Sequence, residues 1–163
     1  MKAALACAVA YRPRLILLDE PLSGLDALAR DEFIQALLGR AAGATILISS
    51  HDLAEVETFV SHVGYLDRGR IEFSQELATL SERFREIEVT LAAPPLPPPT
   101  WPAGWLNPQT FSAMIRFVDS QFDEHRTRQT IERLFPAARS ISATPMPLRE
   151  IFVALAGAKR EAA

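Results

Sequence analysis

Two neighbouring carboxylates, Asp19 and Glu20, follow the apolar run Leu15–Leu18. An unbroken apolar run that stops at Asp-Glu-Pro predicts a strand of a parallel sheet, buried on both faces. Open α/β sheets bind ligands at the carboxyl edge of their strands, so both acids are expected there. A strand-end Asp can hold Mg²⁺, and an adjacent Glu can orient or deprotonate a water that attacks a phosphate. The simpler interpretation is a helix-entry turn whose acids face solvent, and this motif alone does not decide between the two.

A second apolar strand is predicted at Thr45–Ser49, and His51 follows it closely. The segment between the two strands predicts a helix that begins after Asp26, a residue type suited to capping a helix N-terminus. Strand, helix and strand together predict a βαβ crossover in a parallel sheet. Because parallel strands end at one edge, His51 is expected close to Glu20. Taken alone, a histidine at a strand end is more often a hydrogen-bonded structural residue.

The rest of the chain predicts further elements, which are a short helix after residue 52, a hairpin turning at 67–70, a helix over 77–84, strands over 87–91 and 111–117, a helix over 123–135, a strand near residue 141 and a final helix from residue 148. Seven prolines between residues 94 and 108 predict an extended loop over 92–108. The expected organisation is an α/β domain over 1–85 and a small α+β appendage over 86–163.

These motifs together resemble one family. Asp19-Glu20-Pro21 with Ser23-Gly24-Leu25-Asp26 resembles the Walker B strand and D-loop of ABC ATPases, and Ser50-His51-Asp52 resembles their H-loop. The hairpin segment 64–71 is similar to the one those domains carry next, so that the resemblance covers residues 1–73. It implies the C-terminal part of an ABC-type P-loop NTPase, with a parallel sheet and flanking helices. Residues 147–152 resemble, less specifically, the appendage of exporter-type subunits.

The resemblance also implies roles for four residues and two cofactors, ATP and Mg²⁺. Asp19 would hold Mg²⁺, directly or through water, and Glu20 would be the catalytic base. His51 would contact the γ-phosphate, and Asp26 in the D-loop would face a second ATP-binding subunit across a head-to-tail dimer. The other implied partners are transmembrane permease subunits. They would hold a cytoplasmic subunit at the inner face of the cell membrane, and the transporter would be an exporter.

Departures from the family pattern are equally definite. The sequence contains no Gly-x-x-x-x-Gly-Lys-[Ser/Thr] phosphate loop (Walker A), no Q-loop and no Leu-Ser-Gly-Gly signature, and residues 2–11 resemble the helix that follows the signature. We therefore expect a truncated chain that is inactive alone, whereas the intact ATP-binding subunit from which it derives would hydrolyse ATP. The alternative is a short non-catalytic regulatory or binding module that pairs with a full-length ATPase subunit.

Composition excludes several other classes. Apolar residues make up 48% of the 163 residues and charged residues 23%, as in ordinary globular proteins. A net charge of −3 without a Lys/Arg cluster argues against a nucleic-acid partner. The single cysteine, Cys7, excludes an internal disulfide, and no Cys/His spacing indicates zinc. The absence of sustained heptads argues against the chromosome-organising and DNA-repair ATPases, which carry long coiled coils.

Overall fold

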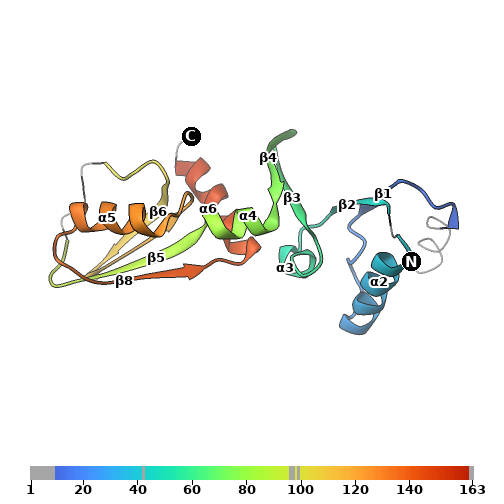
Figure 1. The fold of residues 1–163 in the computed structure, drawn as a ribbon, viewed down its shortest axis with the longest axis horizontal. Helices are drawn as coiled ribbons and strands as arrows, with labels where there is room; N and C mark the ends of the chain where they lie inside the picture. The colour runs from blue at the N-terminus through green and yellow to red at the C-terminus, as the bar shows by residue number, and fades with distance from the viewer. Residues whose placement is uncertain (1–9, 42, 96–97, 99, 162–163) are drawn as a thin grey trace. The chain divides into compact units, whose positions relative to one another are not determined.

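The computed structural model describes residues 10–41, 43–95, 98 and 100–161. The helix predicted over residues 2–11 and Cys7 fall almost entirely outside this range. The chain divides into two compact units, Met1–Phe59 and Val60–Ala163. Together they form a mixed α/β chain whose elements are shown in Figure 1. The predicted domain division after residue 85 lies inside the second unit, and compact units need not coincide with domains, so that division stays a prediction.

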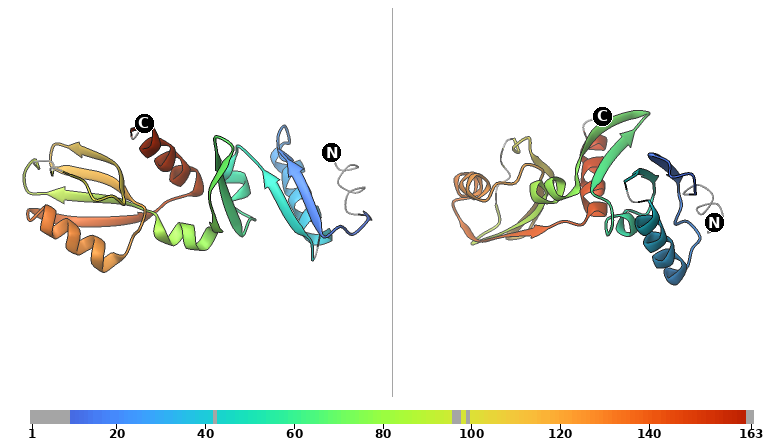
Figure 2. Two further views of the ribbon diagram at one scale, coloured as in Figure 1. Left: turned by 90° about the horizontal axis from the view of Figure 1, so that it is seen from above. Right: turned by 45° about the vertical axis from the view of Figure 1, so that its right-hand side comes forward.

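The first unit contains the predicted strand-helix-strand sequence. Its elements are β1 (Leu15–Asp19), α2 (Ala27–Arg40), β2 (Thr45–Ser49) and the single-turn helix α3 (Leu53–Val56). β1 and β2 are parallel and in register from the pair Leu15 and Thr45 to the pair Asp19 and Ser49. α2 lies beside the two strands in Figure 1 and Figure 2. The expected βαβ crossover is therefore confirmed for this pair.

One face of this strand pair is exposed. Ile16 is 5% exposed, whereas Leu17 of β1 is 65% and Leu47 of β2 is 62% exposed. The prediction of strands buried on both faces is therefore wrong for the described part of the chain. The physical reason is that side chains of a strand alternate between two faces, and a single helix beside two strands can cover only one.

The second unit begins with the predicted hairpin of β3 (His62–Asp67) and β4 (Arg70–Glu76). Arg68 and Gly69 form the two-residue connection, and both have positive φ, +47° and +78°. Positive φ at both central positions gives the turn a twist that matches the twist of the flanking strands, and glycine adopts it without steric cost. Helix α4 (Leu77–Arg83) follows directly.

An antiparallel four-stranded sheet forms most of the remainder, in the order β6-β7-β5-β8. Its strands are β5 (Arg85–Leu91), β6 (Trp105–Phe111), β7 (Met114–Asp119) and β8 (Ala138–Pro145), and the helices are α5 (Glu124–Leu134) and α6 (Leu148–Glu161). In Figure 1 and in the left view of Figure 2, α5 runs along the sheet. β6 begins inside the predicted Pro-rich loop, which is a correction. Pro108 is tolerated there because it lies at a register shift of an edge strand, between the paired residues Leu106 and Gln109, where its missing N–H removes no ladder hydrogen bond.

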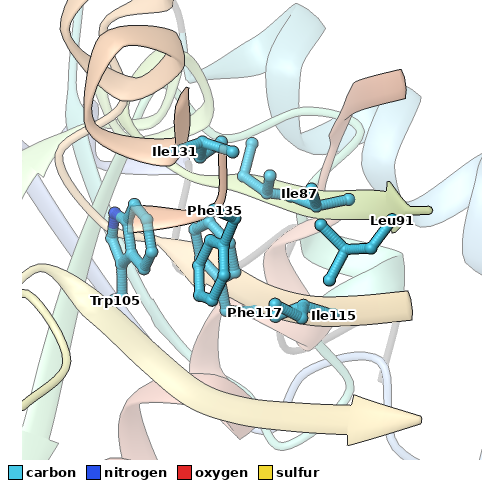
Figure 3. Packing of buried hydrophobic residues seen from close by; sticks show 8 residues of the cluster. Ile87, Leu91, Trp105, Ile115, Phe117, Ile131 and Phe135 are labelled. Carbon is cyan, nitrogen blue, oxygen red and sulfur yellow. The ribbon is translucent and has the colours of Figure 1, made fainter. Parts of the chain in front are cut away.

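The core of this unit is a cluster of buried side chains from the sheet and α5. Figure 3 shows Trp105, Ile115 and Phe117 from β6 and β7, with Ile131 of α5 above them. The rings of Trp105 and Phe117 stack with their centroids 3.9 Å apart. Burial of apolar side chains is the main favourable contribution to folding, and aromatic rings bury the most area. The second unit therefore has its own hydrophobic core.

A buried carboxylate at the end of β7 is satisfied locally. Asp119 is 3% exposed, and its Oδ2 accepts a hydrogen bond from the Thr127 hydroxyl at 2.6 Å. Its Oδ1 accepts from the backbone N–H of Gln121 at 2.9 Å. Because a buried acid without donors costs stability, these contacts account for Asp119 as a structural residue that joins β7 to α5.

Candidate active site

Hydrogen bonds of Ser49 connect the ends of β1 and β2. The Ser49 hydroxyl donates a hydrogen bond to Asp19 Oδ1 across the parallel pair. The backbone N–H of Glu20 is directed at Ser49, 3.2 Å from its carbonyl oxygen and 3.1 Å from its hydroxyl. Register and hydrogen bonds therefore bring both carboxylates to the edge from which the segment with His51 departs.

Glu20 and His51 are in direct contact. His51 Nδ1 lies 2.8 Å from Glu20 Oε2. An ionised carboxylate only accepts hydrogen bonds, so Nδ1 carries the proton and donates it. The side chains are accessible, 77% exposed for His51 and 37% for Glu20. The expected closeness of the two residues is confirmed, and Nε2 of the imidazole and Oε1 of Glu20 are left for a further ligand.

The backbone at Glu20 is in the left-handed region. Its φ is +45°, a value that favours glycine and that costs a residue with a side chain on the order of 1–3 kcal/mol. The bonds from Glu20 N–H to Ser49 and from Ser23 N–H to the Glu20 carbonyl, at 3.2 Å, hold this conformation. Such conformations cluster at functional sites, where they direct one side chain. Here that side chain is the carboxylate that meets His51.

Asp26 caps helix α2, as the sequence predicted. Its φ of −70° and ψ of 167° are extended, and its Oδ1 accepts from the backbone N–H of Ala29 at 2.8 Å. This bond satisfies one of the free N–H groups at the helix start. The predicted role of Asp26 at a subunit interface is a separate matter and stays a prediction.

A cavity of about 160 Å³ opens beside this edge. Its lining includes Glu20, Ser23, Arg30, His51, Asp52 and Glu55. Arg30 and Glu55, which form an ion pair, were not predicted as site residues. The available signal in the sequence was a positive charge near the start of α2 and a negative charge on α3, the two helices that follow the ends of β1 and β2. Because charged residues are common on exposed helix faces, that signal is weak without the structure.

The contact with Glu20 raises the pKa of His51 above its ordinary value of 6.5. The hydrogen bond to Glu20 is the largest cause, followed by the negative charge of Glu20, with smaller contributions from Asp52 and Glu55. Both main causes favour the protonated imidazole. A larger fraction of His51 therefore carries a second N–H, on Nε2, which can donate to an anionic oxygen.

Titration of His51 by NMR in the 163-residue chain is expected to give a pKa above 6.5, and Glu20→Gln is expected to return it toward that value. The sign follows from linkage. A raised folded-state pKa stabilises the fold most below the unfolded pKa, and the contribution is lost as pH rises through the folded value. An unchanged pKa in Glu20→Gln would contradict the contact.

The donor set at this edge fits Mg²⁺. No group of three or more His, Cys, Asp or Glu side chains able to hold a metal occurs in the described ranges. Mg²⁺ does not need one, because it binds through one or two carboxylates and takes its remaining oxygens from waters and substrate phosphates. Asp19, whose Oδ1 is oriented by Ser49, leaves its other carboxylate oxygen for such a role.

Several known proteins are similar to this chain, although no family model matches it. The protein named Aliphatic sulfonates import ATP-binding protein SsuB 2, from Xanthomonas axonopodis pv. citri (strain 306), is 43% identical over 72 residues, covering 43% of this chain and 25% of that relative. ABC transporter ATP-binding protein YtrB of Bacillus subtilis (strain 168) is 34% identical over 87 residues, covering 52% and 30%. A further SsuB 2, from Pseudomonas aeruginosa (strain UCBPP-PA14), is 36% identical over 121 residues, covering 66% and 44%.

The chain thus spans less than half the length of these relatives, between 25% and 44%. All three are named as ATP-binding proteins, one of an ABC transporter and two of aliphatic sulfonates import. The exporter expectation finds no support in them, since two of the three are named as import proteins. The matches agree with the resemblance carried by the Asp-Glu strand end and the Ser-His-Asp segment. Over the matched segments, the chain is similar to the ATP-binding proteins of ABC transporters, which is consistent with a fragment of an ABC ATPase.

Proposed function

We propose that this chain supplies the hydrolytic part of the nucleotide site in an ATP-hydrolysing subunit of an ABC transporter, on a sheet of the P-loop NTPase type. The observation that carries the proposal is the 2.8 Å contact between Glu20 and His51 at the ends of two parallel strands. The similarity to named ATP-binding proteins supports the same function. ATP is the proposed substrate.

Three residues share the proposed chemistry. Glu20 orients and deprotonates the attacking water through the carboxylate oxygen that His51 does not occupy. His51 donates from Nε2 to the γ-phosphate, and its contact with Glu20 favours the protonated imidazole and orients it. Asp19 holds Mg²⁺, directly or through water, and the ion supplies charge neutralisation for the phosphates when bound. Two adjacent carboxylates both stay ionised more easily when such positive charge lies next to them.

The proposed partners follow from the same similarity. We expect transmembrane permease subunits and a second ATP-binding subunit, with Asp26 near the interface of the two ATP-binding subunits in a head-to-tail dimer. No helix within the described residues is both long and apolar enough to cross a membrane. The similarity to these relatives supports a location at the inner face of the cell membrane, reached through the permease. For the direction of transport, the names of the relatives favour import over export.

The test compares the chain alone with a completed subunit. In the completed subunit, the part of the Xanthomonas relative that precedes its matched segment is joined ahead of this chain. The chain alone is expected to hydrolyse ATP negligibly, because its sequence has no Gly-x-x-x-x-Gly-Lys-[Ser/Thr] loop to hold the phosphates. The completed subunit is expected to release phosphate from ATP, and EDTA is expected to stop it.

Two outcomes would count against the proposal. A completed subunit that folds and binds ATP but releases no phosphate would contradict the hydrolytic role. Hydrolysis by the chain alone that depends on Glu20 would contradict the expected inactivity. Phosphate release followed over time, with ATP binding measured separately by calorimetry, distinguishes these results.

A further inference from the structure

We propose that Arg30 and Glu55 form a positioning pair that fixes the turn before α2 to the start of α3, and thereby keeps His51 beside Glu20. The proposal adds two residues to the site and concerns how the imidazole is held. Its catalytic consequence rests on the proposed function, whereas its structural consequence can be measured without ATP. All the residues involved belong to the first compact unit.

On the α2 side, Arg30 is bonded to the turn that precedes its own helix. Its backbone N–H donates to the Asp26 carbonyl at 3.0 Å, as the first bond of the helix. Its guanidinium Nη2 donates to the Leu25 carbonyl at 3.4 Å. Arg30 therefore holds the last two residues of the Ser23–Asp26 segment through two separate groups.

The same guanidinium forms an ion pair with Glu55 on α3. Glu55 in turn donates its backbone N–H to Asp52 Oδ1 at 3.4 Å, and Asp52 donates its backbone N–H to the Ser50 hydroxyl at 3.1 Å. His51 lies between Ser50 and Asp52 in the sequence, so these hydrogen bonds fix the backbone on both sides of it. A displacement of Glu55 would therefore reach the backbone that carries the imidazole.

The length of α3 makes such an anchor necessary. The helix has only four residues, Leu53–Val56, and an isolated helix of one turn is not stable in water. Its position must come from contacts outside itself, and the ion pair with Arg30 is one of them. Val56, which is 7% exposed, stabilises the position of α3 by apolar burial, but this interaction is not directional and does not fix the orientation of the helix.

Burial separates this pair from an ordinary surface ion pair. The side chains of Arg30 and Glu55 are 28% and 14% exposed, compared with 77% for His51. Exposed pairs contribute little because water competes for both partners, whereas removal of one partner from a partly buried pair leaves the other charge poorly solvated. Arg30, Glu55, Glu20 and His51 all line the same cavity. The pair thus lies deeper than the imidazole that it supports.

The first arm of the test uses the 163-residue chain without nucleotide. In Arg30→Met, loss of a nearby positive charge would by itself raise the pKa of His51. Loss of positioning instead breaks the contact with Glu20 and lowers that pKa toward 6.5. We expect the lowering. Arg30→Lys, which keeps the charge and can still pair with Glu55, is expected to restore most of the rise.

Asp31→Asn provides the matched control, since it changes one exposed charge on the same helix. It is expected to leave the His51 titration unchanged. An unchanged or raised pKa in Arg30→Met would overturn the proposal. So would a lowering that Arg30→Lys does not reverse while circular dichroism shows both variants folded, because the effect would then not depend on the ion pair.

The second arm uses the completed subunit. Arg30→Met is expected to lower kcat by roughly tenfold to a hundredfold, with the KM for ATP within about twofold, because misplacement of a catalytic group affects the transition state more than binding. Equal kcat in Arg30→Met and the unsubstituted subunit would overturn the proposal while leaving the function intact. If the unsubstituted subunit is inactive, the proposed function fails, and the first arm alone decides the positioning role.

Discussion

Replacement of Glu20 by glutamine in the completed subunit is expected to lower ATP turnover by about 10²–10⁴-fold, the range that a general base contributes. Glutamine keeps the size of the side chain and its oxygen acceptor, but it cannot take a proton from water. The contact with His51 at 2.8 Å loses its charged partner at the same time. Because Glu20 is not proposed to hold the nucleotide itself, the Kd for ATP is expected to stay within a few-fold.

Single-turnover phosphate release measures this effect without interference from product dissociation. Asp31→Asn again serves as the control, since Asp31 is an exposed carboxylate of α2 that does not line the cavity. Its turnover is expected to equal that of the unsubstituted subunit. Comparable turnover in Glu20→Gln would remove Glu20 from the chemistry and leave it with the structural role of orienting His51.

Phe117→Ala is expected to lower the free energy of unfolding of the second compact unit by about 3–5 kcal/mol. Phe117 is 1% exposed and stacks on Trp105, so the truncation leaves a cavity and removes the ring contact. A loss of this size is a large part of the roughly 5–15 kcal/mol by which domains are stable. Both tryptophans of the chain, Trp101 and Trp105, lie in this unit, so fluorescence during urea unfolding reports on it directly.

Phe111→Ala is the matched control for this experiment. Phe111 ends β6 and is 44% exposed, so the same truncation there removes little buried area. The expected change is on the order of 0.5 kcal/mol. Similar losses for the two substitutions would show that the cluster drawn in Figure 3 is not the main source of stability in this unit.

Local signals predicted the elements of the first unit well. The run Leu15–Leu18, the cap at Asp26 and the strand at Thr45–Ser49 each depend on a few adjacent residues, and the structure has all three. The closeness of Glu20 and His51 followed from one topological rule, that parallel strands end at one edge. Their roles in catalysis stay proposals, because proximity does not by itself establish chemistry.

Features that depend on distant residues were not predictable in the same way. The exposure of Leu17 is decided by what covers the sheet, which the strand's own residues do not encode. Proline content predicted a loop at Pro108, but pairing with β7 makes that segment an edge strand. The ion pair of Arg30 and Glu55 joins residues on two helices, and charge on a helix face is compatible with many other partners.

Residue 20 is a position where foldability and chemistry favour different amino acids. Its φ of +45° suits glycine, which would relieve the strain but remove the carboxylate that contacts His51. Selection for thermostability alone would therefore favour substitutions that remove the proposed catalytic base. Under the role proposed for Glu20, glutamate at this backbone position is a stability–activity trade-off at one residue, and screens for robust variants of this chain should hold position 20 constant.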